Sequence, residues 1–242
     1  MSLLAVVQDV CAVVGVTQPT TSIFAAIGSN RTMFEMLALA NEMAQRIAYD
    51  TRDWQGLQRS VTYSGNGTAT DFALPADYKR MLLTSNVRMS TNPQQSMRFI
   101  SDYDEWLWRR AQNLYDGRGE WIITGGRMLI DPVMSAGVSA TYPYLDRNCI
   151  ALASGGFGDR FMADADTFRL DERLLKLGMT WQWKAHKGSP YAEDMGSFSD
   201  ALATAMGHDK PMPIIVGRRA MSWSNTNASY PFPSDQTWTW PL

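Results

Sequence analysis

Apolar residues with helical spacing lie near both ends of the chain and enclose a middle part with strand spacing. This order constrains the fold more than any other feature, because apolar helix stripes of this size have to be buried. In the N-terminal part the spacing predicts helices over residues 3–14 and 31–50, and Ser29 or Asn30 can cap the second one. On that second helix, the apolar positions recurring at helical spacing are Phe34, Leu37, Ala40, Ala44 and Ile47. Beyond the middle part, helices are predicted over residues 171–187 and from Ser189-Pro190 onward.

The middle part has the pattern of a small, mostly β module. Its clearest hairpin places strands at residues 120–124 and 127–130 around Gly125-Gly126, since a Gly-Gly pair supplies the positive φ angles of a two-residue turn. The turn-rich residues 64–68 indicate a second hairpin loop. A further strand is predicted over residues 138–144, and a short helix capped by Ser101 or Asp102 is predicted to run through Arg110.

We therefore predict an α+β fold. Helices from both chain ends close into one antiparallel helical bundle, and a small antiparallel β module is inserted into it. The predicted parts are the N-terminal helices of the bundle (1–57), the inserted β-rich module (58–150), a loop with the C-terminal helices of the bundle (151–209), and an extended Pro/Trp-rich tail (210–242).

The tail contains five prolines and few charged residues. Its prolines exclude a helix, and it is too aromatic for an ordinary disordered linker. The apolar area of its aromatic side chains is too small to offset the entropy lost when more than thirty residues are ordered. We infer that the tail is mobile in the free protein and becomes ordered by laying its aromatic side chains on partner surfaces. The alternative is that it wraps back on its own domain. The aromatic side chains in question are Trp223, Tyr230, Phe232, Trp238 and Trp240.

Two tryptophan pairs outside the tail raise the question of subunit contacts. Trp181 and Trp183 are about 200° apart on a helix, so one packs inward and the other can face a neighbouring subunit. The pair Trp106 and Trp108 raises the same question. Trp183 and Trp108 therefore join the tail aromatics as predicted partner-binding residues.

Composition and charge exclude several classes of protein. The net charge is −2, and the basic residues are scattered apart from the pairs Arg109-Arg110 and Arg218-Arg219. A chain that grips DNA needs a clustered basic surface, so sequence-specific DNA binding is not expected, although DNA could pass through a lumen. No stretch approaches the ~20 apolar residues that span a bilayer, and we expect neither a signal peptide nor membrane association.

The sequence also lacks motifs for catalysis, for phosphate binding and for metal binding. The acidic run does not fit a calcium loop, because a loop starting at Asp164 would have Phe168 and Arg169 at the positions of an oxygen ligand and a glycine. Residues 154–158 lack the ending of a phosphate-binding loop, and there is no G-x-S-x-G or CxxC motif. We expect no metal, no cofactor and no catalytic residue, and hence no enzyme. The acidic run consists of Asp159, Asp164, Asp166, Asp171 and Glu172.

The order of several short motifs resembles the head-to-tail adaptor proteins of tailed bacteriophages, which are connectors of the tail tubular or gatekeeper type. The motifs are MLALANE (36–42), DWQGL (53–57), FALPADYKR (72–80), LIDP (129–132), ADADT (163–167), LDERLLKLG (170–178), WQWK (181–184) and the Lys187-Gly188 pair. The resemblance covers roughly residues 3–205 and does not include the tail.

The resemblance implies a structural virion protein at the head–tail connector, assembled in the host cytoplasm. Such proteins form a homo-oligomeric ring, a dodecamer, which docks beneath the portal protein. A tail nozzle, tube or other tail protein lies below the ring, and DNA passes through its central channel. The motifs are structural, so the resemblance transfers no catalytic residue.

Two alternative functions stay open. A carbohydrate-binding or cell-wall-degrading virion component is suggested by the tryptophans, since flat aromatic faces suit sugars. Binding to glycans or lysis of peptidoglycan would distinguish it. A nucleic-acid-binding module would instead show the steep salt dependence that phosphate contacts cause.

Overall fold

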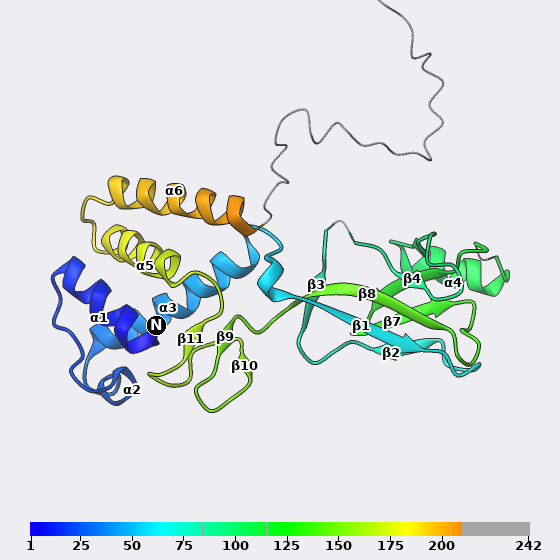
Figure 1. The fold of residues 1–242 in the computed structure, drawn as a ribbon, viewed down its shortest axis with the longest axis horizontal. Helices are drawn as coiled ribbons and strands as arrows, with labels where there is room; N and C mark the ends of the chain where they lie inside the picture. The colour runs from blue at the N-terminus through cyan, green and yellow to red at the C-terminus, as the bar shows by residue number, and fades with distance from the viewer. Residues whose placement is uncertain (84, 115, 210–242) are drawn as a thin grey trace, which may run out of the picture. The chain divides into compact units, whose positions relative to one another are not determined.

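The structure is a computed structural model that describes residues 1–83, 85–114 and 116–209, and Met1–Lys210 form one compact unit (Figure 1). The helices are α1 (Leu3–Val14), α2 (Ile23–Ala26), α3 (Arg31–Tyr49), α4 (Tyr103–Ala111), α5 (Glu172–His186) and α6 (Ala192–Asp209), with a 3-10 turn at Gln55–Leu57. The strands are β1 (Gln58–Ser64), β2 (Asp71–Ala73), β3 (Tyr78–Met81), β4 (Arg88–Met89), β5 (Arg98–Phe99), β6 (Glu120–Thr124), β7 (Arg127–Asp131), β8 (Ser139–Asp146), β9 (Ile150–Ala151), β10 (Phe157–Gly158) and β11 (Thr167–Phe168).

Side-chain caps fix the starts of three helices, and those at Asn30 and Asp102 are among the predicted candidates. Ser2 accepts a hydrogen bond from an N–H group in the first turn of α1, Asn30 does the same for α3, and Asp102 for α4. The helix predicted after Ser189-Pro190 begins only at Ala192, and the four-residue helix α2 was not predicted.

The strands form three sheets. One has the order β1-β8-β3 with β4 also on β8, the second has the order β2-β7-β6-β5, and the third is the small sheet β10-β9-β11. The predicted hairpin at Gly125-Gly126 is confirmed, because β6 pairs antiparallel with β7 from Thr124 opposite Arg127 onward. Both glycines have positive φ, 55° and 75°.

The prediction that residues 64–68 form a hairpin loop is wrong. The strands on either side do not pair with each other, because β1 pairs with β8 and β2 pairs with β7. The segment instead carries the chain from one sheet to the next. It is held by hydrogen bonds from the Gly65 N–H to the Val138 carbonyl and from the Gly67 N–H to the Met134 carbonyl. A Cβ atom on Gly65 would lie 2.5 Å from the Met134 carbonyl oxygen, so this close approach requires glycine.

The α+β class is right, but the predicted antiparallel helical bundle with a small β insert is wrong. Strands and scattered helices alternate along the described chain. The strands and the helix α4 between residues 58 and 146, the β part of the chain, include two four-stranded sheets. The core around α1, α3 and α5 also contains side chains from strands and loops, namely Trp54, Leu145, Ile150, Phe161 and Phe168. In addition, α6 has no fully buried residue. Periodicity shows that a helix stripe is buried, but it does not show what covers that stripe.

The predicted divisions after residues 57, 150 and 209 stay predictions. Leu57 and Leu145, on either side of the first sheet, share the core of the helices. The predicted tail lies outside the described residues. In the part that the structure describes, no helix has both the length and the apolar character to cross a bilayer.

Candidate functional site

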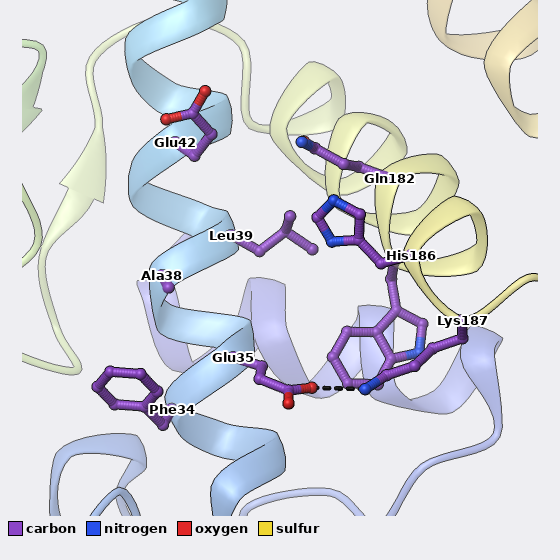
Figure 2. Close-up of a pocket in the computed structure, with 9 residues that line it drawn as sticks. Phe34, Glu35, Ala38, Leu39, Glu42, Gln182, His186 and Lys187 are labelled. Carbon is purple, nitrogen blue, oxygen red and sulfur yellow. Dashed lines mark hydrogen bonds and ion pairs between the residues drawn. The ribbon is translucent and has the colours of Figure 1, made fainter.

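A groove runs between α3 and α5 on the surface of the helical part (Figure 2). Its volume is about 480 Å³, within the range of small ligand sites. Four of the nine lining residues are apolar and five are polar. The apolar residues are Phe34, Ala38, Leu39 and Trp183, and the polar ones are Glu35, Glu42, Gln182, His186 and Lys187.

Helical spacing places these side chains. Phe34, Ala38 and Glu42 follow one another at four-residue steps on α3, so they form one exposed row along the groove. Facing them, α5 contributes Gln182 and His186, which are also four residues apart. The two helices approach closely at Gly178, where an added Cβ atom would lie 2.4 Å from Cε of Met43.

An ion pair crosses the groove at one end. Lys187 Nζ lies 2.6 Å from Glu35 Oε2 and 4.6 Å from the centre of the Trp183 ring, and Arg31 Nε lies 2.9 Å from Glu35 Oε1. Hydrogen bonds from Lys187 and then Arg31 lower the pKa of the Glu35 carboxyl below its ordinary value. Figure 2 shows the Glu35–Lys187 contact that bridges α3 and α5.

The remainder of the groove keeps unused hydrogen-bonding capacity. Glu42 has no ion-pair partner among the residues that the structure describes. The Oε1 atom of Gln182 is buried and accepts no hydrogen bond from that part of the chain. A buried acceptor without a donor costs free energy, and because this oxygen is not exposed, a ligand in the groove meets it only after the Gln182 side chain rotates.

The predicted partner-binding tryptophans have different surroundings. Trp183 is 8% exposed and lines the groove, and it also borders a second hollow of about 740 Å³ next to Val13 and Pro190. Trp181 is half-buried, with its ring 6.4 Å from that of Tyr191. Trp108 is 56% exposed on α4. The partner-binding roles of Trp183 and Trp108 stay predictions.

The other predicted partner-binding residues lie outside the described residues. They are Trp223, Tyr230, Phe232, Trp238 and Trp240.

Next to Trp108, α4 carries further exposed apolar side chains. Tyr103 and Leu107 are each 47% exposed, whereas Trp106 is buried in a small cluster with Ile100 and Ile122. The exposed residues of α4 belong to the β part of the chain, whose cores are separate from the core beneath the groove. The chain therefore has apolar surface in two different places.

The acidic run has structural roles. Asp164 accepts hydrogen bonds from Ser22 Oγ (2.5 Å) and from the Ile23 N–H (2.8 Å) at the start of α2. Asp166 accepts from the backbone N–H groups of Met162 and Ala163 in its own loop and of Ala153 in the loop between β9 and β10. Asp171 caps α5. Within residues 1–209, apart from the two that are not described, no group of three or more His, Cys, Asp or Glu side chains is placed to hold a metal ion.

Sequence reasoning missed a buried charge cluster around Asp146 at the end of β8. The carboxylate is fully buried, and its Oδ2 lies 2.8 Å from both Arg59 Nε and Arg169 Nη1. Its Oδ1 accepts a hydrogen bond from the Asn148 N–H at 2.8 Å. Burial raises the pKa of Asp146, but the hydrogen bonds from Asn148, Arg59 and Arg169 outweigh it and lower the pKa overall. Arg169 also donates to the Gly56 carbonyl, so the cluster connects β1, β8, the 3-10 turn and the segment before α5.

The groove was also missed, because the spacing of α3 assigns Phe34 to the buried face. In the structure Phe34 is 61% exposed. The signal that could have located the groove is the Phe34–Ala38–Glu42 row, in which an exposed aromatic and an acid flank a small residue.

A scan against protein-family models and a search of the curated proteins return no match for this chain.

Proposed function

We propose that this chain is a structural subunit of the ring that joins the head of a tailed bacteriophage to its tail. In this proposal twelve copies surround the DNA channel. One side of the ring binds the portal protein and the other a tail nozzle, tube or similar tail protein.

The observation that carries this proposal is the presence of two separate apolar surfaces on one chain. One is the groove between α3 and α5 with Phe34 at its edge, and the other is α4 with Leu107 and Trp108. Contiguous exposed apolar side chains usually mark sites of protein association. A ring subunit needs several such surfaces, because it contacts two neighbouring copies and a different partner on each side.

The charge distribution supports a channel that lets DNA pass without gripping it. In the β part, Arg98, Arg109, Arg118 and Arg127 each pair with an acidic side chain. Paired arginines are less available for the phosphate contacts that hold DNA.

The direct test is cryo-imaging of assembled virions with density sought at the head–tail joint. We expect twelve copies of residues 1–209 to fit a ring there, with the α3–α5 groove and α4 both in contact with protein. Density for this chain elsewhere in the particle, or its absence from the particle, would contradict the proposal.

A carbohydrate-binding or cell-wall-degrading role is the second candidate, favoured by the exposed indole of Trp108 on α4. Aromatic faces of this kind can stack on sugar rings. The test is a glycan pull-down together with an assay of peptidoglycan lysis, using Trp108→Ala as the matched variant. Binding or lysis that depends on Trp108 would favour this role over the ring.

A further inference from the structure

We propose that the groove between α3 and α5 binds the segment Tyr230-Pro231-Phe232-Pro233 of a second copy of this chain. The inference rests on the proposed ring, since the ring supplies neighbouring copies. It goes beyond the proposed ring by naming the parts of two neighbouring copies that contact each other.

The groove has the chemistry of a site for extended, proline-containing segments. Proteins bind such segments in aromatic-lined grooves, because proline fixes an extended backbone and lowers the entropy lost on binding. Here the apolar lining comes from Phe34, Leu39 and Trp183. The segment offers two aromatic rings alternating with two prolines.

The polar groups of the groove and the segment are complementary. Gln182 Oε1 accepts no hydrogen bond from the residues that the structure describes, and the Tyr230 hydroxyl and the Phe232 N–H are donors that reach it once the Gln182 side chain rotates into the groove. Glu42, which is exposed at the groove, has no ion-pair partner within the described ranges of the chain. The tail beyond Lys210 contains Arg218 and Arg219 but only one acidic side chain, Asp235, so it is net positive.

The length of the tail allows it to reach another copy. It follows Asp209, which lies at the C-terminal end of α6 and pairs with Arg52 at 3.5 Å. The other end of α6 adjoins Trp183, so Asp209 lies about one length of this 18-residue helix, ~27 Å, away from the groove. Twenty residues separate Asp209 from Tyr230, and at full extension they span at most about 70 Å.

A contact between the groove of one copy and the tail of the next joins two different surfaces. Repeated contacts of this heterologous kind close into a ring when the rotation between copies closes, whereas a self-complementary contact stops at two copies. A tail that occupied the groove of its own chain would not use this contact to join copies. Occupancy by the tail of a second copy adds one such contact at every subunit boundary of the ring.

Photo-crosslinking of the full-length chain tests this proposal. A photoreactive phenylalanine analogue replaces Phe34, and equal amounts of isotopically light and heavy protein are mixed at high concentration. Mass spectrometry should find crosslinks from position 34 to residues 229–233, including pairs that combine the two isotopes. The same analogue at Phe99, which is also exposed, is the control and should give at least five-fold less of this product.

Two full-length variants separate the roles of groove and tail. Ala38→Arg places a long side chain across the groove from an exposed position on α3, where arginine is compatible with a helix. Tyr230→Ser combined with Phe232→Ser removes the aromatic rings of the tail. Each should lower the mixed-isotope crosslink at least five-fold, whereas Ala203→Arg, at an exposed alanine of α6, should leave it unchanged.

Sedimentation of the two variants gives a complementary result. Each alone should be monomeric, while their mixture should form a dimer and nothing larger, because one supplies an intact tail and the other an intact groove. Crosslinks only within one isotope, crosslinks unaffected by Ala38→Arg, or a mixture that stays monomeric would overturn the proposal. These outcomes do not depend on where the chain lies in a virion, so this inference and the proposed function can fail separately.

Discussion

Replacing the buried carboxylate of Asp146 by an amide tests how the sheet β1-β8-β3 is joined to the helical core. Asp146→Asn keeps the volume and the acceptor for the Asn148 N–H, but it puts an NH₂ group where Oδ2 accepts from Arg59 and Arg169, each at 2.8 Å. Hydrogen bonds to charged groups contribute about 1.5–3 kcal/mol each. Arg59 is 38% exposed, so its share is discounted for solvent screening, whereas Arg169 is 13% exposed.

We therefore expect Asp146→Asn to lower the free energy of unfolding by about 3 kcal/mol. In urea this corresponds to a fall in the midpoint of roughly 1 M. Circular dichroism and tryptophan fluorescence should both be followed, because the free energy is defined only where the two transitions coincide. The matched control is Asp159→Asn, whose carboxylate is 40% exposed and lies 3.5 Å from Arg147, and it should change stability by less than about 0.5 kcal/mol.

The pH dependence of this effect has a definite sign. The pKa of Asp146 is lowered in the folded protein, so the carboxylate stabilises the fold above the unfolded pKa of about 3.9. That stability is lost as the pH falls through the folded pKa. The difference between wild type and Asp146→Asn should thus be full at pH 7 and shrink below about pH 4. A midpoint shift no larger than that of Asp159→Asn would refute the reasoning.

Three further predictions concern packing and burial. Gly65→Ala should destabilise by about 1–3 kcal/mol, because its Cβ meets backbone atoms, whereas Gly28→Ala enters open space and should change the urea midpoint little. Trp183→Ala should lower the free energy of unfolding by about 3 kcal/mol, and Trp108→Ala by less than 0.5, since only the first is buried; equal losses in urea titrations would contradict this. Burial raises the pKa of the Cys149 thiol to about 11, so at pH 8 it should react with a thiol reagent only after unfolding, and rapid labelling of the native protein would show that the site is open.

Local features of the fold could be predicted from the sequence. The helix over residues 3–14 and the hairpin at Gly125-Gly126 were placed correctly, because an apolar helix face and a two-residue turn depend on residues a few positions apart. The same reasoning failed at residues 64–68. A turn-rich segment there has the composition of a hairpin loop, but its conformation is set by contacts with the distant residues Met134 and Val138.

The candidate site could be predicted only in part. Trp183 was singled out because tryptophan is common in interfaces, but spacing alone could not show that it is buried while Phe34 on α3 is exposed. Exposure depends on what packs over each helix face. The strands β9, β10 and β11, which pair next to the helical core, are two residues long and give no periodic pattern.

By itself the sequence determined where most helices and the clearest hairpin form, since those choices rest on neighbours within one or two turns of chain. Only the tertiary structure decided which strands pair, where the groove lies and how Asp146 is neutralised. The Asp146 contact with Arg59 spans 87 positions along the chain, and the Glu35 contact with Lys187 spans 152. Contacts of that range arise when separate elements pack together, and no pattern along the chain encodes their distances.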